Sequence, residues 1–76
     1  MAKYNGHSSR AAWNVSLWIN NDEGLYGLAR QHVRGATNKD VAAKNMLQDL
    51  REMGMFETPD GYAYTVSSIR KAMVGM

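Results

Sequence analysis

The sequence contains no cysteine, and this absence excludes several kinds of site at once. Disulfide bonds, zinc sites with thiolate ligands and cysteine nucleophiles are all ruled out. A small chain without disulfides is typical of a reducing compartment, so we expect the protein to be cytoplasmic. No apolar run approaches the ~18 residues that a membrane-spanning helix needs, and we expect no membrane partner.

Residues that could carry catalysis or bind a metal are also scarce. The two histidines, His7 and His32, lie far apart, and no carboxylate stands at ligand spacing from them. The acidic residues are explained by helix N-termini, by a turn, or, for Asp49 and Glu52, by the outer part of a predicted helix. There is no glycine-rich phosphate loop and no nucleophile elbow. We therefore expect no enzyme activity, no cofactor and no metal.

The chain has 76 residues, which predicts one domain over residues 1–76. A domain this short buries only about 60% of the surface of its unfolded chain, which leaves a thin core. Such domains often rely on a partner or on self-association, so a homodimer is one possibility. The net charge of +2 is smaller than that of a typical nucleic-acid-binding domain.

Hydrophobic spacing predicts a mainly α-helical domain of about four helices, with a short β-hairpin or turn near residues 55–64. The predicted helices cover residues 10–19, 21–34, 38–53 and 66–74. Their expected N-caps are Ser8 or Ser9, Asn20, Thr37, and Thr65 or Ser67. For the second helix, Asn20 and Glu23 have the spacing of a capping box.

The third predicted helix has the clearest pattern. Its apolar residues fall on one face at 100° per residue, and they are Ala42, Ala43, Met46, Leu47, Leu50 and Met53. We expect Leu47 and Leu50 to be deeply buried. Gly54 is expected to end this helix, and Met55 or Phe56 to fold back onto its last turn. The segment Thr58-Pro59-Asp60-Gly61 predicts a tight turn, because proline suits its second position and glycine its fourth.

The first predicted helix is apolar on two sides. One side carries Ala11, Ala12, Val15, Trp18 and Ile19. Trp13 and Leu17 lie nearly opposite, and Arg10 and Asn14 lie on the polar edge beside them. Such a helix is either buried on both sides or docked to another chain by one of them. Because the domain is small, we predict that Arg10, Trp13, Asn14 and Leu17 bind a partner. The alternative is that Tyr4 and the N-terminal residues cover Trp13 and Leu17.

A second interpretation is nucleic-acid binding. Lys44, Gln48 and Arg51 form a stripe on the outer face of the third helix. Together with the following turn, this helix could form a helix-turn-helix or winged-helix DNA-binding motif. Asp49 and Glu52 lie on the same outer part and would repel phosphates, and a solvated face of mixed charge is the simpler explanation.

The N-terminal third also carries a specific motif. Tyr4-Asn5-Gly6 precedes the run Trp-Asn-Val-Ser-Leu-Trp-Ile-Asn-Asn, which begins at Trp13. This third resembles a group of short proteins of unknown function from bacteriophages and mobile elements, although His7 and Ala12 depart from the pattern. The resemblance implies a phage accessory protein that binds, and inhibits or redirects, a host protein in the host cytoplasm. A small DNA-binding regulator is the alternative.

Overall fold

The computed structural model describes residues 10–76, which form four helices and one tight turn. The helices are α1 (Arg10–Asn21), α2 (Glu23–Gly35), α3 (Lys39–Glu52) and α4 (Val66–Ala72). The prediction of a small, mainly helical domain is therefore confirmed. The predictions made for Tyr4, His7, Ser8 and Ser9 fall outside the described residues. No helix among residues 10–76 is long and apolar enough to span a membrane.

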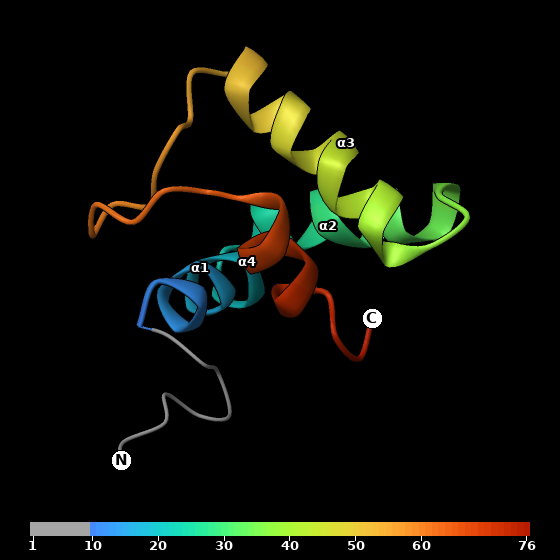
Figure 1. Ribbon diagram of the computed structural model, residues 1–76, viewed down its shortest axis with the longest axis horizontal. Helices are drawn as coiled ribbons and strands as arrows, with labels where there is room; N and C mark the ends of the chain where they lie inside the picture. Colours follow the sequence, from blue (N-terminus) through green and yellow to red (C-terminus); the bar gives the residue numbers. More distant parts are fainter. Residues whose placement is uncertain (1–9) are drawn as a thin grey trace.

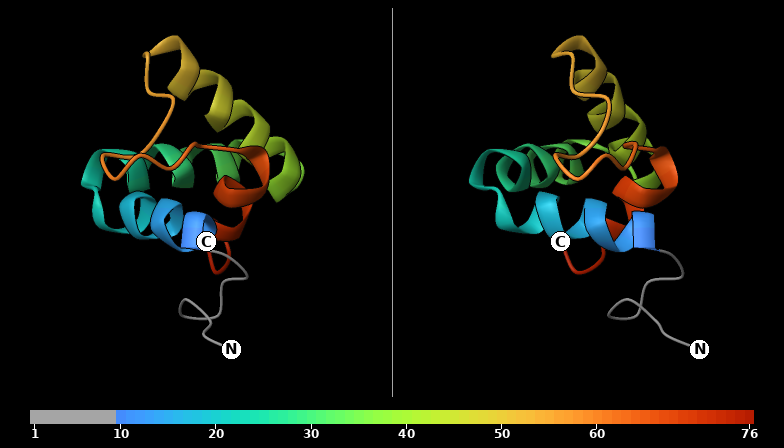
Figure 2. Two further views of the ribbon diagram at one scale, coloured as in Figure 1. Left: turned by 60° about the vertical axis from the view of Figure 1, so that its left-hand side comes forward. Right: turned by 90° about the vertical axis from the view of Figure 1, so that its left-hand side faces the viewer.

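Each of the four helices packs against two others: α1 against α2 and α4, and α3 against α2 and α4. α2 runs back along α1, α3 crosses obliquely over α2, and α4 fills the space between α1 and α3 (Figures 1 and 2). The C-terminal end of α3 extends beyond the other helices, and the chain then descends to α1 before it enters α4. This arrangement leaves the C-terminal end of α3 on the outside of the bundle. The segment that follows it, residues 53–57, is also exposed, and we call it the connector.

The break between α1 and α2 lies two residues later than predicted. α1 continues through Asn20 and Asn21, whose side-chain amides donate hydrogen bonds to carbonyls of their own helix. Asp22 is the N-cap of α2, and its carboxylate accepts a hydrogen bond of 3.0 Å from the Leu25 amide. The predicted capping box of Asn20 and Glu23 is therefore wrong, because an aspartate takes the capping position.

The N-cap of α3 differs from the predicted residue, whereas its C-terminal stop is the predicted glycine. Its N-cap is Asn38 rather than Thr37, since the Asn38 side chain accepts a hydrogen bond of 2.9 Å from the Val41 amide. At the other end, Gly54 has a φ of 76°, as predicted for a residue that stops a helix. The Met55 amide folds back and donates to the Leu50 carbonyl at 2.8 Å, which completes a Schellman motif.

The core is formed by side chains from all four helices and from the segment before α4. Its buried members are Val15, Ile19, Leu25, Ala29, Ala42, Ala43, Met46, Leu47, Leu50, Tyr64, Ile69, Ala72 and Met73. Burial of Leu47 and Leu50 is confirmed. Met53 was expected to join them, but its side chain is 56% exposed because α3 ends at Glu52 and the chain turns outward there.

The predicted turn at residues 58–61 is confirmed. The Gly61 amide donates to the Thr58 carbonyl at 2.8 Å, and Gly61 has a φ of 91°. In the described part of the chain, β structure is limited to one antiparallel bridge between Glu57 and Ala63. After the turn, Thr65 caps α4 in a capping box with Ser68.

Candidate functional site

The outer side of α1 carries three of the four residues predicted to bind a partner. Arg10 is exposed, Trp13 is half-buried and Leu17 is 40% exposed. Trp18, which we expected on the inner side, packs against the core. The helical wheel therefore separated Trp13 and Leu17 from Trp18 correctly, and whether the outer side binds a partner remains a prediction.

Asn14 does not belong to that outer surface. Only 4% of Asn14 is exposed, and its side-chain amide donates a hydrogen bond of 2.7 Å to the Asp60 carboxylate. The Asn14 carbonyl oxygen accepts a hydrogen bond of 2.7 Å from the Thr58 hydroxyl. Its predicted place at the edge of a partner surface is therefore corrected, because the turn folds back onto α1 and covers it.

The Asp60 carboxylate of the turn accepts hydrogen bonds from two side chains of α1. The Trp18 indole N–H donates a second hydrogen bond, of 3.0 Å, to the Asp60 carboxylate. Hydrogen bonds from Asn14 and then from Trp18 lower the pKa of Asp60, and the nearby Arg10 charge acts in the same direction. The turn is thus tied to α1 through Asp60 and Thr58.

The three residues of the nucleic-acid interpretation do lie together. Lys44, Gln48 and Arg51 line one hollow of about 330 Å³, with Leu47 and Val66 at its apolar wall. All three polar residues are exposed. The structure therefore places this stripe on an accessible face.

Asp49 has a role that the sequence did not reveal. Its carboxylate lies 2.6 Å from Nε2 of His32, so the pair links α2 to α3. A second link joins Asp40 on α3 to Arg70 on α4. Neither pair has a local sequence signal, because the residues come from different helices and meet only when the helices pack.

The connector after α3 exposes an apolar surface that our sequence interpretation missed. Met53, Met55 and Phe56 are 56%, 36% and 61% exposed. Two of them, Met53 and Met55, also line a hollow of about 370 Å³, together with Asp22, Gly24, Leu25 and Leu28. We call these three exposed residues and this hollow the connector surface. The available signal in the sequence is the apolar pair Met55-Phe56 directly after Gly54.

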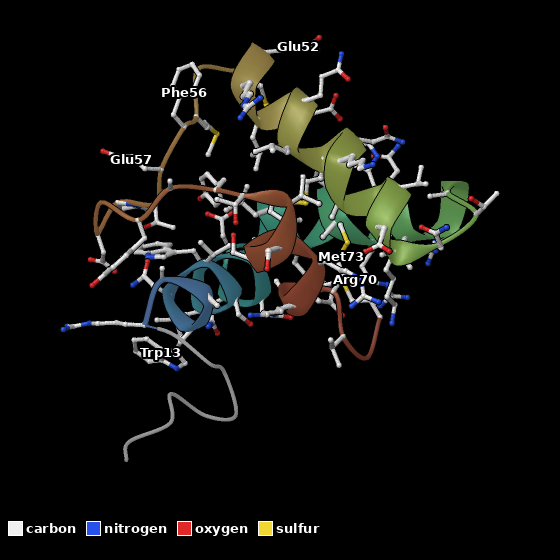
Figure 3. The ribbon with its side chains drawn as sticks, viewed as in Figure 1. Trp13, Glu52, Phe56, Glu57, Arg70 and Met73 are labelled. Carbon is white, nitrogen blue, oxygen red and sulfur yellow. The ribbon has the colours of Figure 1, made fainter. Side chains whose placement is uncertain are left out.

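The connector surface and the outer side of α1 are separate. Figure 3 shows Glu52 and Phe56 at one end of the molecule, Glu57 below them, and Trp13 toward the other end. A single small partner segment therefore cannot cover both.

Within residues 10–76, no three histidine or acidic side chains are grouped closely enough to hold a metal ion. The whole chain, residues 1–76, matches a family described as a family of unknown function (DUF7249). No curated protein and no solved structure matches it. The expected membership of a group of unknown function is confirmed in this general form.

Proposed function

We propose that this chain, which belongs to the DUF7249 family, is a non-enzymatic protein that acts by binding another protein. The observation that carries the proposal is the connector surface, where Met53, Met55 and Phe56 are all exposed and where Met53 and Met55 line a largely apolar hollow. A concentrated apolar patch on a small domain is typical of a protein interaction site.

The character of these side chains supports binding. Methionine is flexible and polarizable, and it is used often on surfaces that adapt to a partner. An aromatic side chain such as Phe56 supplies a large apolar area at low entropic cost. Because the end of α3 extends beyond the other helices, a partner can approach this surface without obstruction from them (Figure 1).

The partner we propose is a host protein that the chain inhibits or redirects. This part of the proposal is supported by the resemblance of the N-terminal third to short phage and mobile-element proteins. The outer side of α1, with Arg10, Trp13 and Leu17, offers a second contact area for the same partner or for a second copy of the chain.

The proposal is tested by capturing partners of the tagged full chain from a bacterial host lysate. We expect wild-type protein to retain a host protein that the Phe56→Ser variant does not. Val74→Ser is the matched control, because Val74 is 70% exposed and lies two residues before the C-terminus, which Figure 1 shows away from the end of α3. Identical sets of proteins on wild type and Phe56→Ser would contradict the proposal.

DNA binding is the second candidate, and the shared hollow of Lys44, Gln48 and Arg51 favours it. If it is correct, a sequence-specific DNA complex persists at physiological salt and is lost in Arg51→Ala. Nonspecific charge attraction would instead produce weak binding that disappears at moderate salt, because released counterions then contribute less.

A further inference from the structure

We infer that the segment recognised by the connector surface is an amphipathic helix with basic residues beside its apolar face. This inference rests on the proposed function and specifies the chemistry of the partner. Two features of the connector surface lead to it: the apolar lining of an open hollow, and the acidic residues that belong to this surface or flank it in the chain.

The apolar lining of the hollow suits a helical segment of a partner. The hollow has a volume of about 370 Å³, and its apolar lining comes from Leu25 and Leu28 on α2 and from Met53 and Met55 beyond α3. It lies between two separate elements and is open on its outer side. A groove of this kind accepts the apolar stripe of an amphipathic helix, whose anchors recur at i, i+3, i+4 and i+7.

Of residues 10–76, the one charged residue that lines the hollow is acidic. Asp22 lines it, and Glu23 follows Asp22 directly in the chain. In the chain, Glu52 precedes Met53 and Glu57 follows Phe56, and all four carboxylates belong to exposed residues. The described residues that line this hollow include no lysine or arginine, and the neighbouring Arg51 lines the separate hollow on α3.

The position of Glu52 in α3 is electrostatically unfavourable. It is the last residue of α3, where the helix dipole favours a cation and disfavours a carboxylate. Departures from local rules concentrate where a protein has a function to serve. A basic partner helix would neutralise Glu52 on binding, which gives this unfavourable position a role.

The test uses two synthetic helical peptides as probes. Both carry leucine at i, i+3, i+4 and i+7, and the remaining positions are lysine in one peptide and glutamate in the other. Binding of each labelled peptide to the full chain is measured by fluorescence anisotropy. The chain has a net charge of +2, so its overall charge favours the glutamate peptide. A preference for the lysine peptide must therefore arise from the local carboxylates.

We expect the lysine peptide to bind at least about threefold more tightly than the glutamate peptide, since each exposed ion pair contributes a small amount. Phe56→Ser should weaken its binding by about tenfold. The double variant Glu52→Gln/Glu57→Gln should remove most of the preference. Its control, Thr37→Lys/Asn45→Lys, changes the net charge by the same amount at exposed sites elsewhere and should leave the preference intact.

Several results would overturn the inference. These are no binding of either peptide, equal binding of both, or an equal effect of the two double variants. Self-association that depends on Phe56, detected by sedimentation, would show that the occupant is a second copy instead. The proposed function fails differently, through capture of host proteins that does not depend on Phe56.

Discussion

The Asp60 carboxylate accepts a hydrogen bond of 2.7 Å from the side-chain amide of Asn14, which lies 46 positions earlier in the chain. The Thr58 hydroxyl donates a second hydrogen bond, to the side-chain carbonyl oxygen of Asn14. This contact holds the turn at residues 58–61 against α1. It therefore fixes one end of the connector whose other end carries Met53, Met55 and Phe56.

Replacing Asn14 with alanine should lower the free energy of unfolding by about 1–3 kcal/mol, because the buried Thr58 hydroxyl loses its acceptor. Urea unfolding followed by circular dichroism measures the change. Asn45→Ala is the control, since Asn45 is exposed on α3 and should change stability little. Equal midpoints for wild type and Asn14→Ala would show that the turn is not held through this residue.

The same contact predicts a dependence of stability on pH. The pKa of Asp60 is lowered from its ordinary value of 3.8 by its hydrogen bonds to Asn14 and Trp18. A lowered pKa in the folded state means that the contribution of Asp60 is fully present above the unfolded pKa. It is lost as the pH falls through the folded pKa.

Asp60→Asn provides the comparison for this prediction. The difference in unfolding free energy between wild type and variant should be constant at neutral pH and should shrink below about pH 4. Urea titrations from about pH 2 to about pH 7 test it, and the other carboxylates cancel because both proteins contain them. A difference that stays the same across this range would exclude the charged form of Asp60 as the stabilising species.

Leu50→Ala should destabilise the domain by about 2–5 kcal/mol, because Leu50 is fully buried in the core. Leu47→Ala should cost less, since Leu47 is 8% exposed and lines the hollow on α3. Thermal unfolding of the two variants gives the order directly. An unchanged melting temperature in both would contradict the assignment of this face of α3 to the core.

Tyr64→Phe should leave stability unchanged or raise it slightly. The phenolic hydroxyl of Tyr64 is buried without a hydrogen-bond partner, and burial, followed by the nearby Asp22 charge, raises its pKa. Removing an unsatisfied buried polar group avoids its desolvation cost, whereas Tyr64→Ala should be strongly destabilising because it leaves a cavity. Denaturant unfolding of both variants measures the contrast. A marked loss of stability in Tyr64→Phe would mean that the hydroxyl is bonded in solution.

Trp13→Ala tests the outer side of α1. Because Trp13 is half-buried, we expect the variant to stay folded, with a loss of about 1 kcal/mol or less, and to bind the proposed partner more weakly. Trp18→Ala is the control and should lose more stability, since Trp18 packs on the core and binds Asp60. If Trp13→Ala proves as destabilising as Trp18→Ala, the outer side of α1 belongs to the core instead.

Local chemistry made much of the fold predictable. The apolar spacing of α3, the stop at Gly54 and the turn before Gly61 depend on residues within a few positions of one another, and all were found from the sequence. The errors in capping were also local. Two polar residues near each helix start could accept the same backbone hydrogen bond, and propensity alone did not choose between Thr37 and Asn38.

The sequence by itself determined the helical class, the face of α3 that is buried and the opposite placement of Trp13 and Trp18 on α1. Only the tertiary structure decided that Asn14 is internal, that Asp49 meets His32, and that Met53 and Met55 border a hollow with α2. The physical reason is that helical periodicity fixes which residues share a face. It carries no information about which other helix or turn comes to cover that face.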